Sequence, residues 1–455
     1  MMRSINPYDG SVVAEVPLWR DELVTAAIDE VADRVPQWQA TSIEQRCDHL
    51  RKIAVQLRSE KQTLATLISR EMGKLIGEAE AEVEKCAWVC DYYADEGPGF
   101  LQDETIESDA GHSYVTYQPL GIVLAVMPWN FPFWQVFRFV APALVAGNSA
   151  LLKHASNVPG AAREIEALLL RAGLPQGVFR SLMISAAQVA QVIDDPRVAA
   201  VTLTGSDGAG RSVAAAAGGQ LKKSLLELGG SDAFIVLEDA DLDRAVEVGV
   251  ISRFLNGGQS CIAAKRFIVV EAIAEPFLEK FQQAVEALKV GDPLDGETTL
   301  APMARSDLRD ELHQQVEASL VAGAVARCGC HPLEGTDTGY APSILDGVAP
   351  GMPAYREELF GPVAIVIRAK DEADAIRIAN DSPFGLGGSV WTADLTRGAW
   401  VAHQVETGAM FVNGLVKSDP RLPFGGIKQS GYGRELSRMG ILEFVNAKTV
   451  WMAAQ

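Results

Sequence analysis

The chain has 455 residues, and its 40 lysines and arginines stand against 59 aspartates and glutamates, which gives a formal net charge of −19. Hydrophobic residues make up 48% and charged residues 22%, a mixture typical of a globular protein with a large core, and the length suggests two or three domains. A surface this negative repels phosphate backbones, so we expect no nucleic-acid partner. The most apolar stretch, residues 120–137, is interrupted by Pro128, Asn130, Pro132 and Gln135, which excludes a bilayer span.

The cysteines and the N-terminus bear on the cellular compartment. The N-terminus lacks the long apolar segment of a secretory signal, and six cysteines are too few for a disulfide scaffold of this size. Cys86 and Cys90 share a helix face and Cys328 and Cys330 flank one glycine, but no histidine pair completes a zinc site around them. We therefore expect a cytoplasmic protein with no metal and no membrane attachment.

The first hundred residues are expected to be mostly helical. Apolar residues recur close to every 3.6 positions over residues 21–38. Ser42, with Gln45 three residues later, forms a capping box that begins a second helix. That helix, or a pair of helices, runs to about residue 73, and a further helix follows over residues 75–93.

From residue 113 onward the pattern alternates between strands and helices. Strands are expected over 113–126, 150–153, 178–184, 198–204 and 223–228, and helices over 160–171, 186–193 and after the glycine-rich turn at 205–210. Short connections between alternating strands and helices indicate a mostly parallel sheet that is covered on both faces. This is a doubly wound plan, in which the ligand binds at the carboxyl ends of the strands.

A second α/β block extends from about residue 230 to residue 429. Its clearest elements are a strand at 267–270, a helix at 274–288 and a strand at 364–368. The last twenty residues end in an apolar strand that includes 449–452. Such a strand needs a sheet to join, in this chain or on another subunit.

Three side chains near the ends of these elements could carry chemistry. Cys261 is a lone thiol beside flexible glycines, and a buried structural cysteine is the alternative. Glu227 ends an apolar strand and precedes two glycines, so burial would raise its pKa and suit it to general-base work, unless it turns to solvent. Asn130 lies in a loop pinned by two prolines, where it would either donate to an oxyanion or be a satisfied buried amide.

The turn at 205–210 reads Gly-Ser-Asp-Gly-Ala-Gly. It follows a strand and opens a helix, a context that suits a pyrophosphate at a helix N-terminus. It does not match G-x-G-x-x-G, so by itself it is a weak dinucleotide signal.

Taken together, seven segments in this order resemble the NAD(P)-dependent aldehyde dehydrogenase superfamily over essentially the whole chain. They are Pro128-Trp-Asn-Phe-Pro132, Lys153 with Ser156, Gly205-Ser206, Glu227-Leu-Gly-Gly230, Gly258-Gln-Ser-Cys261, Glu358-Leu-Phe-Gly-Pro362 and Phe424-Gly-Gly-Ile-Lys428. The joint match favours the functional interpretations of Cys261, Glu227 and Asn130 over the structural ones.

The resemblance implies a covalent mechanism. The thiolate of Cys261 would attack the aldehyde carbon, and the Asn130 side chain with the Cys261 backbone N–H would stabilise the resulting oxyanion. Hydride transfer to the nicotinamide would leave a thioester, and Glu227 would activate the water that hydrolyses it. CoA-acylating relatives typically lack this glutamate, so its presence favours release of a free acid.

The resemblance also implies the cofactor contacts. Lys153 would reach the adenosine ribose and Glu358 the nicotinamide ribose, while Trp129 and Phe360 would pack near the ribose and the nicotinamide. Gly205 and Ser206 would form the phosphate turn. NAD-preferring members often carry glutamate three residues after the lysine, where this chain has Ser156. We therefore expect NADP as the preferred cofactor and NAD as a weaker one.

Within the superfamily, the chain is most similar to the short succinate-semialdehyde dehydrogenases of bacteria. Their substrate carries a carboxylate at the end remote from the aldehyde, so a cation should line the tunnel. Arg138 can clamp that carboxylate with two hydrogen bonds, and a structural salt bridge is the alternative. Ser418 is the expected second ligand, Trp134 is expected to form a wall, and Ser260 is also expected to contact the substrate.

Other functions stay open at this point. A neighbouring activity is oxidation of glutarate semialdehyde or of an uncharged medium-chain aldehyde, since sequence does not give the shape of a tunnel. A different class is a cysteine esterase or hydrolase, and a third is a non-catalytic member of the fold. The presence of both Cys261 and Glu227 disfavours the last.

The expected architecture is an α/β fold with three parts. Residues 1–100 and 120–229 form a doubly wound, parallel-sheet NAD(P)-binding domain, and residues 230–431 form an α/β catalytic domain. Residues 101–119 and 432–455 form a β-strand oligomerisation arm. Related proteins extend a partner's sheet with this arm, so a homodimer or homotetramer is expected.

Overall fold

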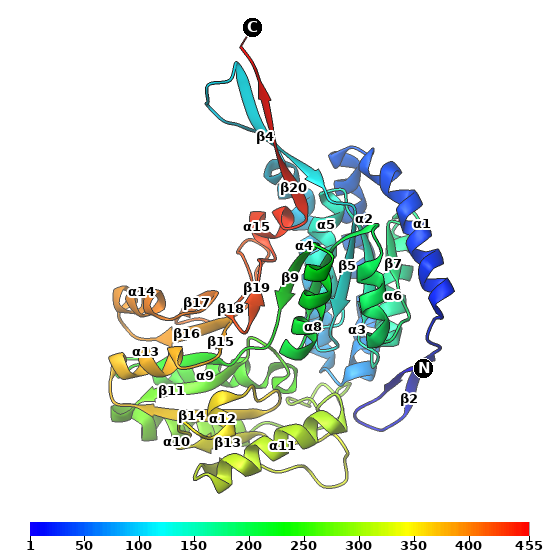
Figure 1. Ribbon diagram of the computed structural model, residues 1–455. Coiled ribbons are helices and arrows are strands. Elements are labelled where there is room, and N and C mark those ends of the chain that lie inside the picture. Colours follow the sequence, from blue (N-terminus) through cyan, green and yellow to red (C-terminus); the bar gives the residue numbers. More distant parts are fainter. Residues whose placement is uncertain (455) are drawn as a thin grey trace.

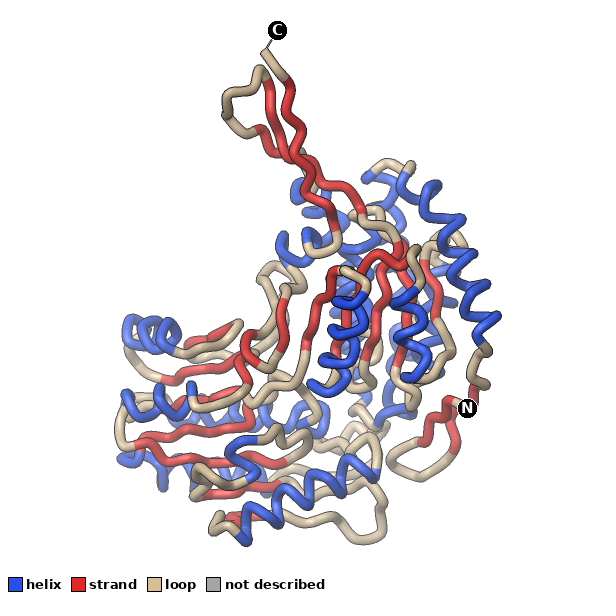
Figure 2. Tube along the Cα trace, in the orientation of Figure 1, coloured by secondary structure: helices blue, strands red, loops and turns tan. Residues whose placement is uncertain are grey.

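Two mostly parallel sheets, each covered by helices on both faces, organise the chain (Figure 1). In the computed structural model, which describes residues 1–454, the first sheet lies in the N-terminal half and the second in the C-terminal half. A narrow three-stranded sheet projects away from both of them (Figure 2). No helix among the described residues is both long enough and apolar enough to cross a membrane.

The first sheet has the strand order β19-β9-β8-β5-β6-β7. Its neighbours pair in parallel except β19, which pairs antiparallel with β9. The chain runs outward through β5, β6 and β7 and then returns to β8 and β9 on the other side of β5. Ligands of doubly wound sheets bind where the strand order reverses, which here lies between the carboxyl ends of β5 and β8. The strands are β5 (Ile122–Met127), β6 (Ser149–His154), β7 (Phe179–Ser181), β8 (Val198–Thr204), β9 (Lys223–Glu227) and β19 (Gly431–Tyr432).

The two faces of the first sheet bury separate sets of side chains, because successive strand residues point to opposite faces. On β5, Val123 and Ala125 join a core with α2, α4 and α5, whereas Ile122 and Leu124 join a core with α1, α7 and α8. The helices of this half are α1 (Asp21–Gln39), α2 (Ile43–Ser59), α3 (Lys61–Met72), α4 (Ile76–Phe100), α5 (Trp134–Val145), α6 (Pro159–Arg171), α7 (Val189–Asp194) and α8 (Asp207–Gly219), with a short turn η1 (Ala186–Gln188).

The second sheet has the order β12-β13-β14-β11-β10-β16-β17, and only β12 pairs antiparallel. Helices α9 and α10 share a core with one face of it, and α11 to α14 with the other. Its strands are β10 (Asp232–Val236), β11 (Ala264–Val270), β12 (Val325–Cys328), β13 (Ser343–Asp346), β14 (Val363–Ala369), β16 (Gly387–Trp391) and β17 (Ala409–Val412). Its helices are α9 (Leu242–Phe254), α10 (Ala274–Glu286), α11 (Ser306–Val321), α12 (Pro353–Arg356), α13 (Glu372–Asn380) and α14 (Leu395–Gln404), with the turns η2 (Leu255–Gly258) and η3 (Glu271–Ile273).

The projecting arm is a three-stranded antiparallel sheet of order β20-β4-β3. Figure 1 shows β4 and the red C-terminal β20 extending together beyond the helices. The strands are β3 (Glu104–Thr105), β4 (His112–Pro119) and β20 (Val445–Met452). Two further small pairs are β1 (Met2–Ile5) with β2 (Val12–Val16), and β15 (Phe384–Gly385) with β18 (Ile427–Lys428).

The structure corrects the expected C-terminal boundary of the arm. The sequence places all of 432–455 in the arm, but α15 (Ser437–Leu442) packs against α4 and α5. Tyr432 belongs to β19, which extends the first sheet. These residues pack with the first sheet because Leu436, Ile441 and Phe444 are apolar and reach its core.

Three other sequence expectations differ from the structure. The strand expected over 113–126 is two strands, since β4 pairs with β20 in the arm whereas β5 lies in the first sheet. The helix expected to end at residue 93 continues to Phe100. The strand expected over 178–184 is ordered as a strand only over Phe179–Ser181.

A buried carboxylate in α4 fixes the start of α5, the helix that follows the switch-point strand. Helix α5 has no side-chain cap of its own, and Glu82 accepts hydrogen bonds from the backbone N–H groups of Phe133 (2.9 Å) and Trp134 (3.0 Å). The other oxygen of Glu82 pairs with the Lys74 ammonium, and both side chains are 1% exposed. Lys74 also lies 3.7 Å from the ring centre of Phe131. This set of contacts positions the loop between β5 and α5.

We expect Glu82→Ala to destabilise the protein by about 3–5 kcal/mol, because it leaves the Lys74 ammonium buried without a partner and two N–H groups without an acceptor. The measurement is the denaturation midpoint in urea. Glu84→Ala is the matched control: Glu84 lies on the same helix but is 45% exposed and paired with Arg58, so its loss should cost less than about 1 kcal/mol. Equal shifts for the two variants would contradict this role for Glu82.

Candidate functional site

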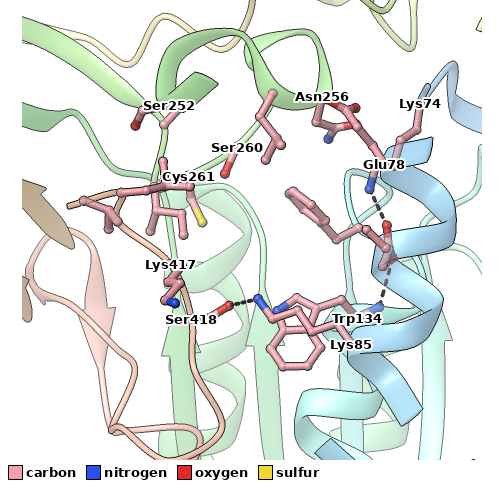
Figure 3. Close-up of a pocket in the computed structure, with 18 of the residues that line it drawn as sticks. Lys74, Glu78, Lys85, Trp134, Ser252, Asn256, Ser260, Cys261, Lys417 and Ser418 are labelled. Atoms are coloured by element: carbon pink, nitrogen blue, oxygen red, sulfur yellow. Dashed lines mark hydrogen bonds and ion pairs between the residues drawn. The ribbon is translucent and has the colours of Figure 1, made fainter. Parts of the chain in front are cut away.

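Two cavities are lined by Cys261. The first has a volume of about 380 Å³ and lies among α4, α5, the loop before Cys261 and the loop after β17 (Figure 3). The second has a volume of about 530 Å³ and lies at the carboxyl ends of β5 and β8, which is the reversal point of the first sheet. Cys261 and Gln135 line both cavities. The thiol therefore lies where the two cavities meet.

The loop that carries Cys261 has an unusual backbone. Asn256, Gly257 and Gly258 have φ values of 57°, 64° and 74°, in the left-handed region. A Cβ on Gly258 would lie 2.3 Å from the carbonyl oxygen of Gly361, so only glycine fits there. The loop consequently lies close to the segment that contains Glu358.

Four side chains from different elements satisfy the buried backbone groups of this loop. Glu78 of α4 accepts from the Asn256 N–H at 3.1 Å, and the Asn130 side-chain amide donates to the Gln259 carbonyl at 3.1 Å. Arg253 of α9 donates to the carbonyls of Gly258, Leu359 and Gly361. Lys265 of β11 donates to the carbonyls of Ser260 (2.7 Å) and Cys261 (2.8 Å). The loop that carries Cys261 is therefore held by both halves of the chain.

Burial raises the pKa of the Cys261 thiol to about 12, and the nearby charges of Lys265 and Arg138 oppose the shift. The thiol of the unliganded protein is thus mostly protonated near neutral pH. A base or an additional positive charge is needed to produce the thiolate that acts as a nucleophile.

Asn130 and Glu227 occupy different settings beside the thiol. Asn130 is buried and lines the second cavity together with Cys261, and one N–H of its amide remains after the bond to Gln259. Glu227 ends β9 and is also buried, and neither oxygen of its carboxyl group has a hydrogen-bond partner among the described residues. Burial, followed by the charge of Glu435, raises the pKa of Glu227 well above its usual range. Glu227 is not among the residues that line either cavity.

The second cavity has the features of a dinucleotide crevice. Trp129 and Phe360 form an edge-to-face pair with ring centres 5.9 Å apart, and both line it. Glu358 lines it too, accepting from the Gly230 N–H at 3.2 Å and pairing with Lys265 at 3.0 Å. A Cβ on Gly229 would lie 2.3 Å from a Glu358 oxygen, so glycine is required for this approach.

The turn predicted to bind phosphate and the residues predicted to bind the adenosine ribose lie along the same sheet edge. Gly205 and Ser206 line the second cavity, and Ser206 begins α8 by accepting from the Ala209 N–H at 3.3 Å. The free N–H groups at that helix start suit an anionic group. Lys153 lies one residue before the end of β6, next to β5, and is partly buried, while Ser156 follows in the next loop and is exposed. A nicotinamide dinucleotide lying along the carboxyl ends of β8, β5 and β6 fits these residues.

The first cavity has an apolar wall and several charged groups. Trp134 and Ser260 line it and are buried, and Ser418 reaches it from the loop after β17. Arg138 lines it as well, but its Nε pairs with the buried Glu435 and its Nη2 donates to the Thr204 hydroxyl at 3.2 Å. The structural salt bridge that the sequence left as the alternative for Arg138 is therefore formed.

Five residues that support the site were not anticipated from the sequence: Glu78, Lys85, Arg253, Lys265 and Glu435. Lys265 lies in the fully buried strand β11, where a charged residue is a signal that could have identified it. Glu78 and Lys85 lie on α4 among many other charged residues, so the sequence gives no local signal for them. Lys85 donates to the Ser418 hydroxyl at 2.8 Å within the first cavity (Figure 3). No group of three or more side chains suited to a metal ion occurs in residues 1–454.

A thiol between a crevice of the doubly wound sheet and a second, mostly apolar cavity is the arrangement expected of a nicotinamide-dependent oxidoreductase with a cysteine at its site. The chain belongs to the aldehyde dehydrogenase family, whose model matches residues 1–450. This confirms the resemblance inferred from the seven ordered segments.

Several relatives match nearly the full length of the chain. It is 51% identical over 450 residues to a probable succinate-semialdehyde dehydrogenase [NADP(+)] of Synechocystis, covering 99% of each protein. It is 48% identical over 448 residues to the succinate semialdehyde dehydrogenase [NAD(P)+] Sad of Escherichia coli, covering 98% of this chain and 97% of that protein. The crystal structure of succinic semialdehyde dehydrogenase from Streptococcus pyogenes in complex with NADP+ matches with a TM-score of 0.98, at 39% identity and over 100% of each chain.

Because the pKa of Cys261 is raised to about 12, we expect its alkylation by iodoacetamide in the unliganded protein to accelerate about tenfold per pH unit from pH 7 to pH 10. Mass spectrometry of the peptide that contains Cys261 measures this rate separately from the other five thiols. A rate that levels off near neutral pH would show that the thiolate is already formed, against this account.

Proposed function

We propose that this chain oxidises succinate semialdehyde to succinate with NADP+ as the preferred cofactor and NAD+ as a weaker one. The observation that carries the proposal is the meeting of the two cavities at Cys261, with a dinucleotide crevice on one side and a small cavity bearing cationic side chains on the other. Relatives at about half identity along the whole chain are named for the same reaction.

In the proposed reaction, the Cys261 thiolate attacks the aldehyde carbon and forms a thiohemiacetal. The remaining Asn130 amide hydrogen and the Cys261 backbone N–H stabilise its oxyanion. A bound nicotinamide would supply the hydride acceptor, and loss of hydride from this carbon would leave a thioester on Cys261. Glu227 then takes a proton from a water molecule that attacks the thioester, and the step releases succinate and the Cys261 thiolate, which regains a proton when the site returns to its resting state.

The cofactor contacts are proposed for the residues along the sheet edge. Trp129, Glu358 and Phe360 would enclose the nicotinamide end, and Gly205 with Ser206 the phosphates. Lys153 and Ser156 would bind the adenosine ribose and its 2′-phosphate. An exposed hydroxyl at position 156 donates to a phosphate, whereas a carboxylate there would repel it.

The assembly and the compartment are proposed on separate grounds. The arm leaves one edge of the eight-residue strand β20 unpaired, with Trp451 52% and Met452 46% exposed, so we expect a second copy of the chain to cover it in a homodimer or homotetramer.

All six cysteines are free thiols, and a catalytic thiol needs a reducing compartment, which favours the cytoplasm.

The proposed substrate and cofactor are tested together by following reduction of NADP+ and NAD+ by succinate semialdehyde. We expect a higher kcat/KM for NADP+, and we expect Ser156→Glu to lower the value for NADP+ by about 100-fold while sparing NAD+, because like charges would face each other. Reduction of both cofactors equally by the wild type would contradict the role of Ser156. Turnover of hexanal but not of succinate semialdehyde would overturn the substrate.

A second prediction concerns the hydrolytic half of the reaction. Glu227→Gln should still reduce about one equivalent of NADP+ per active site in a rapid burst, whereas steady turnover falls by about 10²–10⁴-fold because no base activates water. Stopped-flow absorbance separates the two phases. In the wild type, the acidic limb of the turnover profile should lie well above the ordinary glutamate value near pH 4.3, since burial raises the pKa of Glu227. Loss of the burst itself would show that Glu227 acts before the thioester forms.

A further inference from the structure

Lys265 is a buried lysine in contact with the loop that carries Cys261. It lies in β11, a strand whose residues are all buried, and it is only 1% exposed. Its ammonium donates to the carbonyls of Ser260 (2.7 Å) and Cys261 (2.8 Å) and lies 3.0 Å from a carboxylate oxygen of Glu358. One ammonium therefore joins the backbone of Cys261 to a carboxylate that lines the second cavity.

The contact with the Ser260 carbonyl matters because of the peptide group to which that carbonyl belongs. The Ser260 carbonyl and the Cys261 N–H are the two ends of one planar peptide unit. Among residues 1–454 the Cys261 N–H donates to no other group, whereas the carbonyl accepts from the Lys265 ammonium and from the Ala263 N–H at 3.2 Å. A charged donor at a carbonyl polarises the peptide and makes its N–H a stronger donor.

We propose that Lys265 is a positioning residue for the oxidation: it orients and polarises the peptide between Ser260 and Cys261, and its charge stabilises the anions that form at the Cys261 sulfur and at the substrate oxygen. This inference rests on the proposed function, because it takes the Cys261 N–H as a donor to the oxyanion. Lys265 lines neither cavity, so it acts through the Cys261 loop.

The Cys261 thiol lies within the electrostatic influence of Lys265. Burial raises the pKa of Cys261 to about 12, and Lys265 opposes this shift more than any other cation does. Arg138 opposes it less, while Glu358 and Glu227 add to it. Arg138 is held in its own buried salt bridge and makes no hydrogen bond to the Cys261 loop. Lys265 is therefore the cation that acts on the loop both by contact and by charge.

Two carboxylates face Lys265 and determine how far its charge is offset. The Glu358 side chain is 19% exposed and lines the second cavity, so solvent weakens its pairing with Lys265. Asp232, at the start of β10, is buried; burial raises its pKa to about 7, and Lys265 is the main group that opposes the shift. A carboxylate that is only partly ionised near neutral pH offsets the lysine incompletely. Lys265 thus retains positive charge for the reacting groups.

The test compares Lys265→Met with the wild type in the full-length protein. Without cofactor or substrate, alkylation of Cys261 by iodoacetamide should slow about tenfold at every pH from about 8 to 10, because the thiolate is less stable. With NADP+ and succinate semialdehyde, kcat should fall about 10–100-fold and KM should change less than about threefold, since the effect acts on anions formed after binding. A loss of structure would expose the thiol and accelerate its alkylation. Unchanged or faster alkylation would overturn the proposal.

Glu358→Gln alters the same charges in the opposite direction while Lys265 stays in place. The substitution keeps the size of the side chain and removes the negative charge beside the ammonium. Alkylation of Cys261 in the unliganded protein should therefore accelerate about three- to tenfold. This variant decides the question if Lys265→Met does not fold, because an unchanged or slower rate in Glu358→Gln contradicts the role of Lys265.

Lys222→Met is the matched control. Lys222 precedes β9, at the end of the first sheet opposite to the site, and its ammonium also donates to two backbone carbonyls, those of Ile193 and Asp195. Its loss should leave the alkylation rate and kcat within about threefold of the wild type. Equal effects of Lys222→Met and Lys265→Met would count against the proposal.

The experiment separates this inference from the proposed function. If the wild type oxidises another aldehyde but not succinate semialdehyde, the proposed function fails. The alkylation series contains neither substrate nor cofactor, so it still decides whether Lys265 controls the reactivity of Cys261.

Discussion

The site between the two sheets depends on the buried loop before Cys261, whose backbone is not satisfied by the regular hydrogen bonds of a helix or a strand. Backbone N–H and C=O groups that are removed from water need partners, and the loop before Cys261 has left-handed residues where a helix or strand would supply them. The partners are side chains instead, and they come from α4, α9, β11 and the loop after β5. Each of these hydrogen bonds comes from an element that belongs to one of the two sheets or packs against it. The position of the Cys261 thiol is therefore fixed where the two halves of the chain meet. It depends on the packing of both halves.

Burial also determines which groups around the Cys261 thiol are charged in the unliganded protein. The cations Lys74, Arg138 and Lys265 each have a carboxylate partner in or beside the cavities. Cys261 and Glu227, in contrast, have pKa values raised by burial, so both are held in their neutral forms in the unliganded protein. Two uncompensated anions would otherwise face each other in a poorly solvated space, which is costly. The groups that must become charged during the reaction are thus protonated at rest, whereas Lys74, Arg138 and Lys265 are already paired with carboxylates.

The sequence predicted the local elements and the chemistry better than it predicted the contacts. The capping box predicted the helix that begins after Ser42, and the apolar pattern predicted the strand that ends at Thr204. Both signals depend only on residues that are close in the sequence. The ordered motifs gave the family, and Cys261, Asn130, Trp134 and Ser418 do line the two cavities. The pairing of Arg138 with Glu435 joins residues almost three hundred positions apart, and nothing in the motif containing Arg138 indicates its partner. For the same reason Lys85 was missed: its meaning comes from Ser418, which lies beside it only after the C-terminal half has packed.

The helix that follows the switch-point strand accounts for the shape of the whole site. In a doubly wound sheet the strand before the reversal ends at the nucleotide crevice, and here β5 ends in the loop with Trp129 and Asn130. Helix α5 then begins at once, capped by Glu82, and its first turns carry Trp134, Gln135 and Arg138. Gln135 faces both cavities, so this helix is the wall between them. A single connection therefore ends the crevice on one side and forms one wall of the small cavity on the other, while the contacts of the Cys261 loop place the thiol where the two cavities meet.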